Sequence, residues 1–263
     1  MSWDDFPFFA LPAAALWLVA GVLALRADTP RRRLAVHLPM LVGIALFAAF
    51  IALFWTALQR PPLRTMGETR LWYAFFLASA GYLTWLRWRH SWLLLLTAAM
   101  AATFAAIDVL RPEIHSIALM PALQSFFFVP HVVIYILAYA LFGVATLAAL
   151  AQIVRLRRDT ADTSLFAFMD DAVHVGFGFL ALGLLLGAVW AKEAWGHYWS
   201  WDPKETLAFI TGAAYLVYIH LRAQGRADAL AAWALPVAFL LLLLGWLGTA
   251  LFPGAQGSLH LYS

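Results

Sequence analysis

The sequence predicts an all-α, polytopic membrane protein with about eight transmembrane helices and both termini on the outer, periplasmic side. Of its 263 residues, 64% are hydrophobic and 12% are charged, and the mean hydropathy is +0.82. Soluble domains are about half apolar and about a quarter charged, so this chain lies outside their range. Two further observations support the prediction: long apolar segments, and an uneven distribution of arginine between the loops.

The apolar segments predict the membrane-crossing helices. A helix that crosses a hydrocarbon core of roughly 30 Å needs about 20 mostly apolar residues. The third and seventh segments are shorter, so polar or aromatic flanks would complete those crossings. In chain order we expect the helices at about 7–25, 37–58, 71–86, 91–110, 131–154, 172–191, 206–221 and 229–252.

The loops between these segments predict the orientation, because lysine and arginine are more frequent on the cytoplasmic side. With the N-terminus outside, the inner loops hold more basic residues than the outer loops. The inner set is Arg26, Arg31, Arg32, Arg33, Arg87, Arg89, Arg155, Arg157, Arg158, Arg222 and Arg226, and the outer set is Arg60, Arg64, Arg70, Arg111, Lys192 and Lys204. We therefore expect both termini, and the loop between the sixth and seventh helices, to face outward.

The composition also excludes some chemistry. The chain has no cysteine, which excludes disulfides, thiolate metal sites and a nucleophilic cysteine. The first residues, "MSWDDFPFF", are acidic rather than basic, so they do not predict a cleaved signal peptide.

The chain is expected to have an N-terminal four-span region (1–110) and a C-terminal region (111–263) that carries the functional motifs. Within the second region, Gly183, Gly187 and Ala191 are spaced four apart, a stripe of small residues typical of close helix packing. We interpret this stripe as structural.

Eight histidines are notable in so apolar a chain, because ionisable groups at membrane depth are functional candidates. Each could instead lie in the headgroup region, and those that begin an apolar segment could be interfacial anchors. The topology places His37, His90, His174 and His220 at inner ends, and His115, His131, His197 and His260 outside.

His131 is one of three stronger candidates. It follows Pro130, a favourable residue in the first turn of a helix. Helical spacing aligns it with Tyr135, Tyr139 and Phe142 on one face. That face could be an aromatic packing stripe or one wall of a site for a flat ligand.

The other two strong candidates are His260 and His220. His260 lies in the outer tail "GAQGSLHLYS", and His220 ends the seventh helix beside Arg222 at the inner leaflet. The sequence thus offers a pair of outer histidines and a single inner one.

The segment "AWGHYWSWDPKET" (194–206) contains a helix-start signal. Asp202 is a suitable N-cap, Pro203 suits the first turn, and Glu205 stands three residues after the cap, as in a capping box. These residues could do no more than begin the seventh helix.

The aromatic half of the segment needs another explanation. Tryptophans form belts at membrane interfaces, which could account for Trp190 and Trp195. Trp199 and Trp201 stand with Tyr198 in a short loop, which would present a flat aromatic surface. A porphyrin with propionates fits such a surface.

Charged and metal-binding groups near this loop suit the same ligand. Lys192 and Lys204 could bind carboxylates. Histidine imidazole is a common ligand of haem iron.

The segment "WGHYWSWDPKETLAFIT" resembles the tryptophan-rich "WWD" segment of the CcsA proteins of cytochrome c biogenesis (System II), part of a haem-handling superfamily that includes CcmC and CcmF. The resemblance runs from "MPALQSFFFVPHVVIYILAYALF" (120–142) through "GFGFLALGLLLGAVWAKEAWG" to the C-terminus, a little over half the chain. It implies a subunit of a holocytochrome c synthase in the bacterial inner membrane, with the motif facing the periplasm.

The resemblance also implies site residues. His131 and His260 match the outer histidines that would ligate haem b, and His220 matches the intramembrane histidine. No catalytic residue is implied, because the CXXCH thiols of apocytochrome c would add to the haem vinyl groups. The outer haem would lie against Trp195, Tyr198, Trp199, Trp201 and Asp202.

The family's second intramembrane histidine comes from CcsB, so a separate CcsB-type partner is implied. His197 stands where a small or variable residue is expected, and is either an extra ligand or a neighbour of the site. Alternatives are CcmC-like delivery of haem to a periplasmic chaperone, and a HemX-like regulatory membrane protein.

Overall fold

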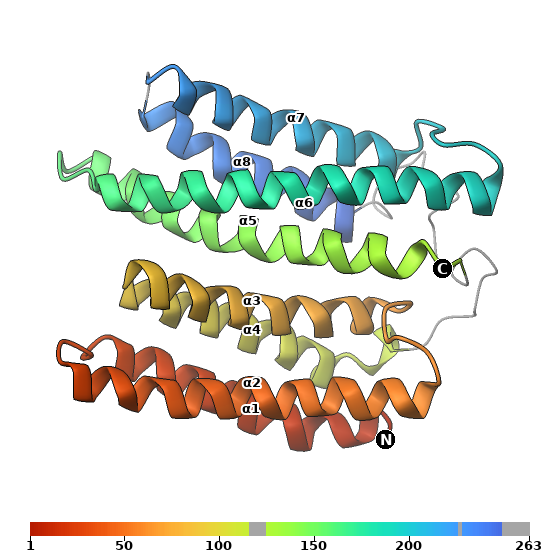
Figure 1. Cartoon of the computed structure of the whole chain (residues 1–263), viewed down its shortest axis with the longest axis horizontal. Helices are drawn as coiled ribbons and strands as arrows, with labels where there is room; N and C mark the ends of the chain where they lie inside the picture. The colour runs from red at the N-terminus through yellow and green to blue at the C-terminus, as the bar shows by residue number, and fades with distance from the viewer. Residues whose placement is uncertain (116–124, 226–227, 249–263) are drawn as a thin grey trace. The chain divides into compact units, whose positions relative to one another are not determined.

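The computed structural model describes residues 1–115, 125–225 and 228–248 of the 263. All regular secondary structure in these ranges is helical. The chain divides into two compact units, Met1–Ala118 and Leu119–Ser263. Each contains four long helices (Figure 1).

The first unit is built from two helical hairpins. α1 packs along α2 and α4, while α3 packs along α4 and also contacts α2. Thr65 and Glu68 form a capping box at the start of α3, and the carboxylate of Glu68 also pairs with Arg60 at 2.8 Å. The elements of the first unit are η1 (Trp3–Asp5), α1 (Phe6–Ala24), α2 (Pro30–Leu58), α3 (Met66–Trp88), α4 (Ser91–Leu110) and η2 (Pro112–Ile114).

The second unit carries the motifs singled out from the sequence. α5 packs along α6 and against α8, and α7 packs along α8 and against α6. The helices are α5 (Phe128–Leu156), α6 (Thr163–Trp195), α7 (Pro203–Ala223) and α8 (Asp228–Leu247).

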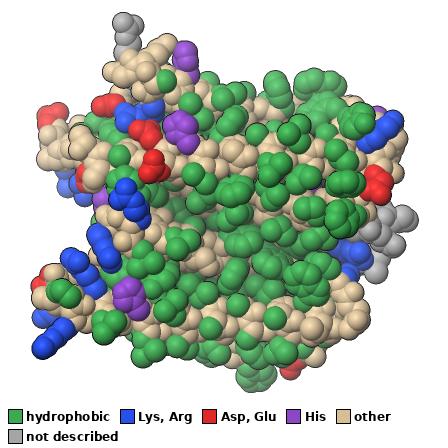
Figure 2. Space-filling view, viewed as in Figure 1, with side chains coloured by type: hydrophobic (Ala, Val, Ile, Leu, Met, Phe, Trp, Pro, Cys, Tyr) green, Lys and Arg blue, Asp and Glu red, His purple; other side chains and the backbone are tan. Residues whose placement is uncertain are grey.

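The helices confirm an all-helical, multi-pass membrane protein. Among the described residues, seven helices are long and apolar enough to cross a membrane. α3 does not meet this criterion; it carries Glu68, Arg70 and Arg87 in its 23 residues. On the face shown in Figure 2, charged side chains gather toward the helix ends and hydrophobic side chains cover the lengths between them. The side on which the termini lie stays a prediction.

Candidate functional site

The capping box predicted at the start of α7 is present and is confirmed. A side-chain oxygen of Asp202 accepts a hydrogen bond from the backbone N–H of Glu205 at 2.9 Å. The carboxylate of Glu205 accepts in return from the backbone N–H of Asp202 at 3.3 Å, and from that of Ser200 at 2.7 Å. Glu205 therefore caps the first turn of α7 and also binds the backbone of the loop before it.

This carboxylate explains the conformation of Trp201. The two backbone N–H groups that it binds belong to Ser200 and Asp202, the neighbours of Trp201 on either side. Trp201 has a φ of 60°, in the left-handed region, which costs a non-glycine residue roughly 1–2 kcal/mol. The hydrogen bonds to Glu205 offset this strain, and Trp201 is 64% exposed.

The loop presents several aromatic side chains together. The ring of Trp201 meets Trp199 edge-on at 5.7 Å and Phe209 of α7 at 5.8 Å. Tyr198 is 59% exposed, and the ammonium group of Lys192 lies 5.6 Å from the centre of its ring. Exposed aromatic faces beside a positive charge can hold a flat, apolar molecule with acidic edges.

An unused donor adds to this surface. The indole Nε1 of Trp199 is buried and makes no hydrogen bond among the described residues. A buried N–H without a partner is costly, so an acceptor at this position would stabilise the loop. The ammonium group of Lys192, by contrast, already donates to the Gly196 carbonyl at 2.7 Å.

His131, at the start of α5, is held in a defined orientation. Its Nδ1 donates to the backbone carbonyl of Gly183 on α6, at 2.8 Å. A carbonyl only accepts, so Nδ1 carries the hydrogen and the Nε2 of the neutral ring can act as a ligand. Histidines that bind metals usually have their other ring nitrogen fixed in this way.

Gly183 and Gly187 allow this arrangement. A Cβ on Gly187 would lie 2.6 Å from Cε1 of His131, and one on Gly183 would lie 2.2 Å from the ring of Tyr135. The stripe of small residues on α6 packs closely, as the sequence predicted. It also forms the surface on which the imidazole of His131 packs, a contact that the spacing of the small residues does not indicate.

Trp190 connects His131 to the tryptophan-rich motif. Its ring is stacked near the imidazole of His131 at 5.6 Å with an interplanar angle of 24°, and it meets Trp195 at 4.8 Å. Trp190 is only 2% exposed, so it is a core residue rather than part of an interfacial belt. The structure thus brings His131 and Trp195 into one aromatic cluster.

The remainder of the α5 aromatic face is packing. His131, Tyr135 and Tyr139 follow one another at ring distances of 4.7 and 5.5 Å. Phe142 is fully buried and stacks on Tyr215 of α7 at 3.6 Å. The sequence left two interpretations of this face open, and for the residues that follow His131, from Tyr135 to Phe142, the packing stripe is the correct one.

His220 lies at the opposite end of α7 from Asp202, about 27 Å away at 1.5 Å per residue. Its side chain is exposed, and its Nε2 lies 2.8 Å from the amide nitrogen of Gln224. The structure therefore separates His220 from the cluster around His131 and the tryptophan-rich loop, as the sequence predicted.

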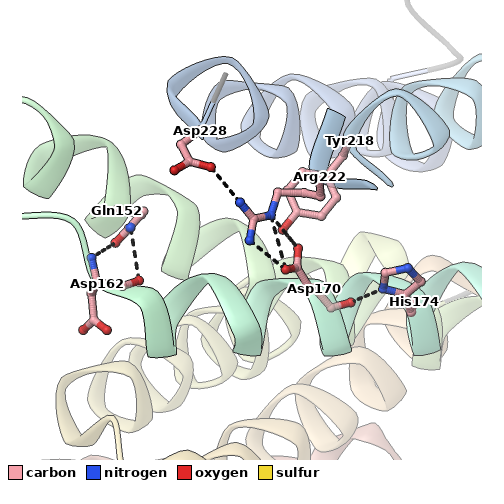
Figure 3. Close-up of polar contacts among 7 residues, drawn as sticks. All are labelled: Gln152, Asp162, Asp170, His174, Tyr218, Arg222 and Asp228. Carbon is pink, nitrogen blue, oxygen red and sulfur yellow. Dashed lines mark hydrogen bonds and ion pairs between the residues drawn. The ribbon is translucent and has the colours of Figure 1, made fainter. Parts of the chain in front are cut away.

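Beside His220 lies a polar cluster that sequence reasoning missed. Asp170 of α6 binds both Tyr218 and Arg222 of α7 (Figure 3). The available signal was an acidic residue within an apolar helix, where such groups are rare and usually paired.

The remaining histidines fall into two groups. His260 lies outside the described residues, and His197 is exposed. No cluster of three or more metal-ligating side chains occurs in the ranges that the structure describes. Four histidines have protein contacts: His37 with the Tyr82 hydroxyl (2.5 Å), His90 with the Trp92 ring (6.3 Å), His115 with the Trp3 ring (3.9 Å), and His174 with the Asp170 carbonyl (2.6 Å).

Comparison with known proteins gives one consistent family. Residues 9–255 match the family model described as cytochrome C assembly protein. The cytochrome c biogenesis protein CcsA of Synechococcus sp. (strain CC9605) is 32% identical over 265 residues, covering 82% of this chain and 85% of that protein. Its counterpart from Cuscuta exaltata is 30% identical over 251 residues, covering 81% and 80%.

Other matches cover less of the relative. The CcsA of Chlamydomonas reinhardtii is 36% identical over 127 residues, which are 45% of this chain and 36% of that protein. Among solved structures, the cytochrome c heme lyase CcmF matches with a TM-score of 0.69 at 18% identity. The match covers 94% of this chain and 47% of that chain, and it shows that the fold is shared.

Proposed function

Because this chain belongs to the cytochrome c assembly protein family, we propose that it carries haem across a membrane and presents it for attachment to apocytochrome c. The relatives named CcsA act in cytochrome c biogenesis. The chain's own contribution is to bind haem, orient it and protect it.

One observation carries the proposal for the outer site. The imidazole of His131 is fixed through Nδ1 to Gly183 and lies against Trp190, which continues to Trp195. A candidate iron ligand is therefore already oriented beside the tryptophan-rich motif. His260, in the tail after α8, is proposed as the second axial ligand.

The loop supplies surfaces for the rest of the molecule. Trp199, Trp201 and Tyr198 would lie against the porphyrin. The Nε1 of Trp199, which has no hydrogen-bond partner in the part of the chain that the structure describes, suits a propionate oxygen. Asp202 would hold the loop in shape through its capping box with Glu205.

Haem b is proposed as the substrate, since it has the two vinyl groups that attachment consumes. Each thiol of the CXXCH segment adds across one vinyl group: a C–S bond forms, and the thiol hydrogen goes to the other vinyl carbon. The addition is redox-neutral, and no residue of this chain forms or breaks a bond. The protein's part is positioning, which can lower the barrier substantially by itself.

His220 is proposed as the inner ligand that receives haem before it moves outward. His220 is exposed, and its Nε2 lies 2.8 Å from the side-chain nitrogen of Gln224, a contact that an iron atom could displace. A second inner ligand would come from a separate CcsB-type membrane protein. A bacterial cell membrane is proposed as the location, and the arginine distribution supports the tryptophan-rich loop lying on its periplasmic side.

The proposal is tested by haem spectra of the chain co-purified with its partner, together with yields of mature cytochrome c. We expect His131→Ala and His260→Ala each to alter the spectrum of the outer haem, and the double variant to abolish maturation. His115→Ala is the control, because His115 is another histidine expected on the outer side, and its ring contacts Trp3 and the Asp108 carbonyl. Normal spectra and normal maturation in the double variant would exclude these ligands.

A further inference from the structure

The inner ends of α6 and α7 are joined through a single carboxylate. Oδ1 of Asp170 accepts from the Tyr218 hydroxyl at 2.7 Å and from Nε of Arg222 at 2.9 Å. Oδ2 accepts from Nη2 of Arg222 at 2.9 Å (Figure 3). This is the two-pronged pairing in which a guanidinium fixes both distance and orientation.

Arg222 is held from two further directions. Its Nη1 donates to Asp228 at the start of α8, at 2.7 Å. Its guanidinium carbon lies 4.2 Å from the ring centre of Phe166 on α6. The side chains of Arg222 and Asp170 are 21% and 27% exposed, so the pair is largely shielded from water.

In the sequence of α7, His220 stands midway between Tyr218 and Arg222, the two residues that Asp170 binds. Tyr218 and Arg222 are four apart and share one face of α7, whereas His220 is turned by roughly 200° from each of them. With Tyr218 fully buried against α6, the imidazole of His220 must face away, and it is exposed. Rotation of this part of α7 is restrained on both sides of the histidine.

We propose that Asp170 is a positioning residue for His220: by binding Tyr218 and Arg222 together, it fixes the rotation of α7 that presents the imidazole outward. This proposal rests on the proposed role of His220 as a haem ligand. Asp170 does not touch the haem; it acts through the backbone of α7. Asp228 contributes less, because it binds only one nitrogen of Arg222 and is 54% exposed.

The cluster could instead serve only to hold the helices together. In that case, loss of Asp170 would reduce the amount of folded protein but leave haem ligation normal in the protein that remains. If Asp170 positions His220, the folded protein itself ligates haem poorly. The two cases differ in the haem spectrum per folded molecule.

The experiment compares variants of the full chain in complex with the proposed partner, after size-exclusion chromatography has isolated the folded fraction. The part of the haem absorbance that is lost in His220→Gly defines the inner haem. We expect Asp170→Asn to reduce inner-haem occupancy by about tenfold, similar to the loss of a residue that orients a metal ligand. Asp170→Glu, which keeps the carboxylate, should retain most of it.

Asp171→Asn is the matched control, because Asp171 is the exposed neighbour of Asp170 on α6, and it should leave occupancy unchanged. If Asp170→Asn does not fold, Tyr218→Phe removes one bond while keeping the ring, and it should lower occupancy by at least twofold. Normal occupancy in the folded fraction of these variants would overturn the positioning role. A spectrum unchanged by His220→Gly would instead overturn the proposed ligand itself.

Discussion

Replacing Gly187 by alanine gives the most direct test of how α6 orients His131. The added Cβ would lie 2.6 Å from Cε1 and 2.8 Å from Nδ1 of the imidazole. Carbon atoms in contact normally stand about 3.5 Å or more apart, so the ring must move by roughly 0.9 Å. That movement would stretch the hydrogen bond from Nδ1 to the Gly183 carbonyl and shift the ring along Trp190.

The expected cost can be separated from the effect of alanine on the helix. Overpacking of this kind costs about 1–3 kcal/mol, while replacing glycine within a helix returns about 1 kcal/mol. Gly178 lies on the same helix, and a Cβ there would meet no described atom within 4 Å. Gly178→Ala should therefore show the helix term alone, and the difference in unfolding free energy between the two variants should be about 1–3 kcal/mol.

Thermal unfolding in detergent measures this difference, at about 2–4 °C for each kcal/mol in a chain of this size. Haem spectra of the same samples should be altered by Gly187→Ala and not by Gly178→Ala. In a His131→Ala background the ring is absent, so Gly187→Ala should become as well tolerated as Gly178→Ala. If Gly187→Ala and Gly178→Ala have the same unfolding temperature and haem spectrum while His131 is present, the described packing of the imidazole against Gly187 is wrong.

Three further predictions concern other parts of the chain. Asp108 is fully buried in α4, and neither of its carboxyl oxygens is hydrogen-bonded among the described residues. Asp108→Asn should therefore raise the unfolding temperature by removing a buried ionisable group, and a fall would contradict this. Trp201→Gly should be more stable than Trp201→Ala by about 1 kcal/mol in thermal unfolding, because glycine adopts the positive φ at little cost, and equal stability would contradict the strain. A hydrogen bond from the Ser164 side chain lowers the pKa of Asp162. The contribution of the Asp162 carboxylate to stability is therefore present above about pH 4 and is lost as the pH falls through the lowered pKa. Asp162→Asn should remove this pH dependence in acid titrations, and an unchanged pH profile would contradict the prediction.

Much of the architecture could be predicted from the sequence because it depends on local patterns. Long apolar runs predicted the helices, and Asp202 with Glu205 predicted the start of α7, since a cap involves residues only three apart. Helix boundaries were less accurate: α3 begins at Met66, five residues before the expected segment, because Thr65 and Glu68 form a capping box there.

The contacts around the candidate site could not be predicted, because they depend on how helices pair. Trp190 matched an interfacial residue by composition, and only the packing of α5 on α6 shows it against His131. Asp170 and Arg222 are 52 residues apart, and no local pattern indicates that they meet.

The length of α6 indicates the depth at which His220 would lie in a membrane. Its 33 residues extend for about 50 Å, well beyond a hydrocarbon core of roughly 30 Å even with an ordinary tilt. The uncharged stretch 175–191 accounts for about 26 Å of this, so the turns that contain Asp170 and His174 continue into the headgroup layer. His220, tied to that level through its neighbours Tyr218 and Arg222, would lie at the membrane boundary rather than the midplane. An amphiphilic molecule with acidic groups could then approach it sideways from one leaflet, with its charges still among the lipid headgroups.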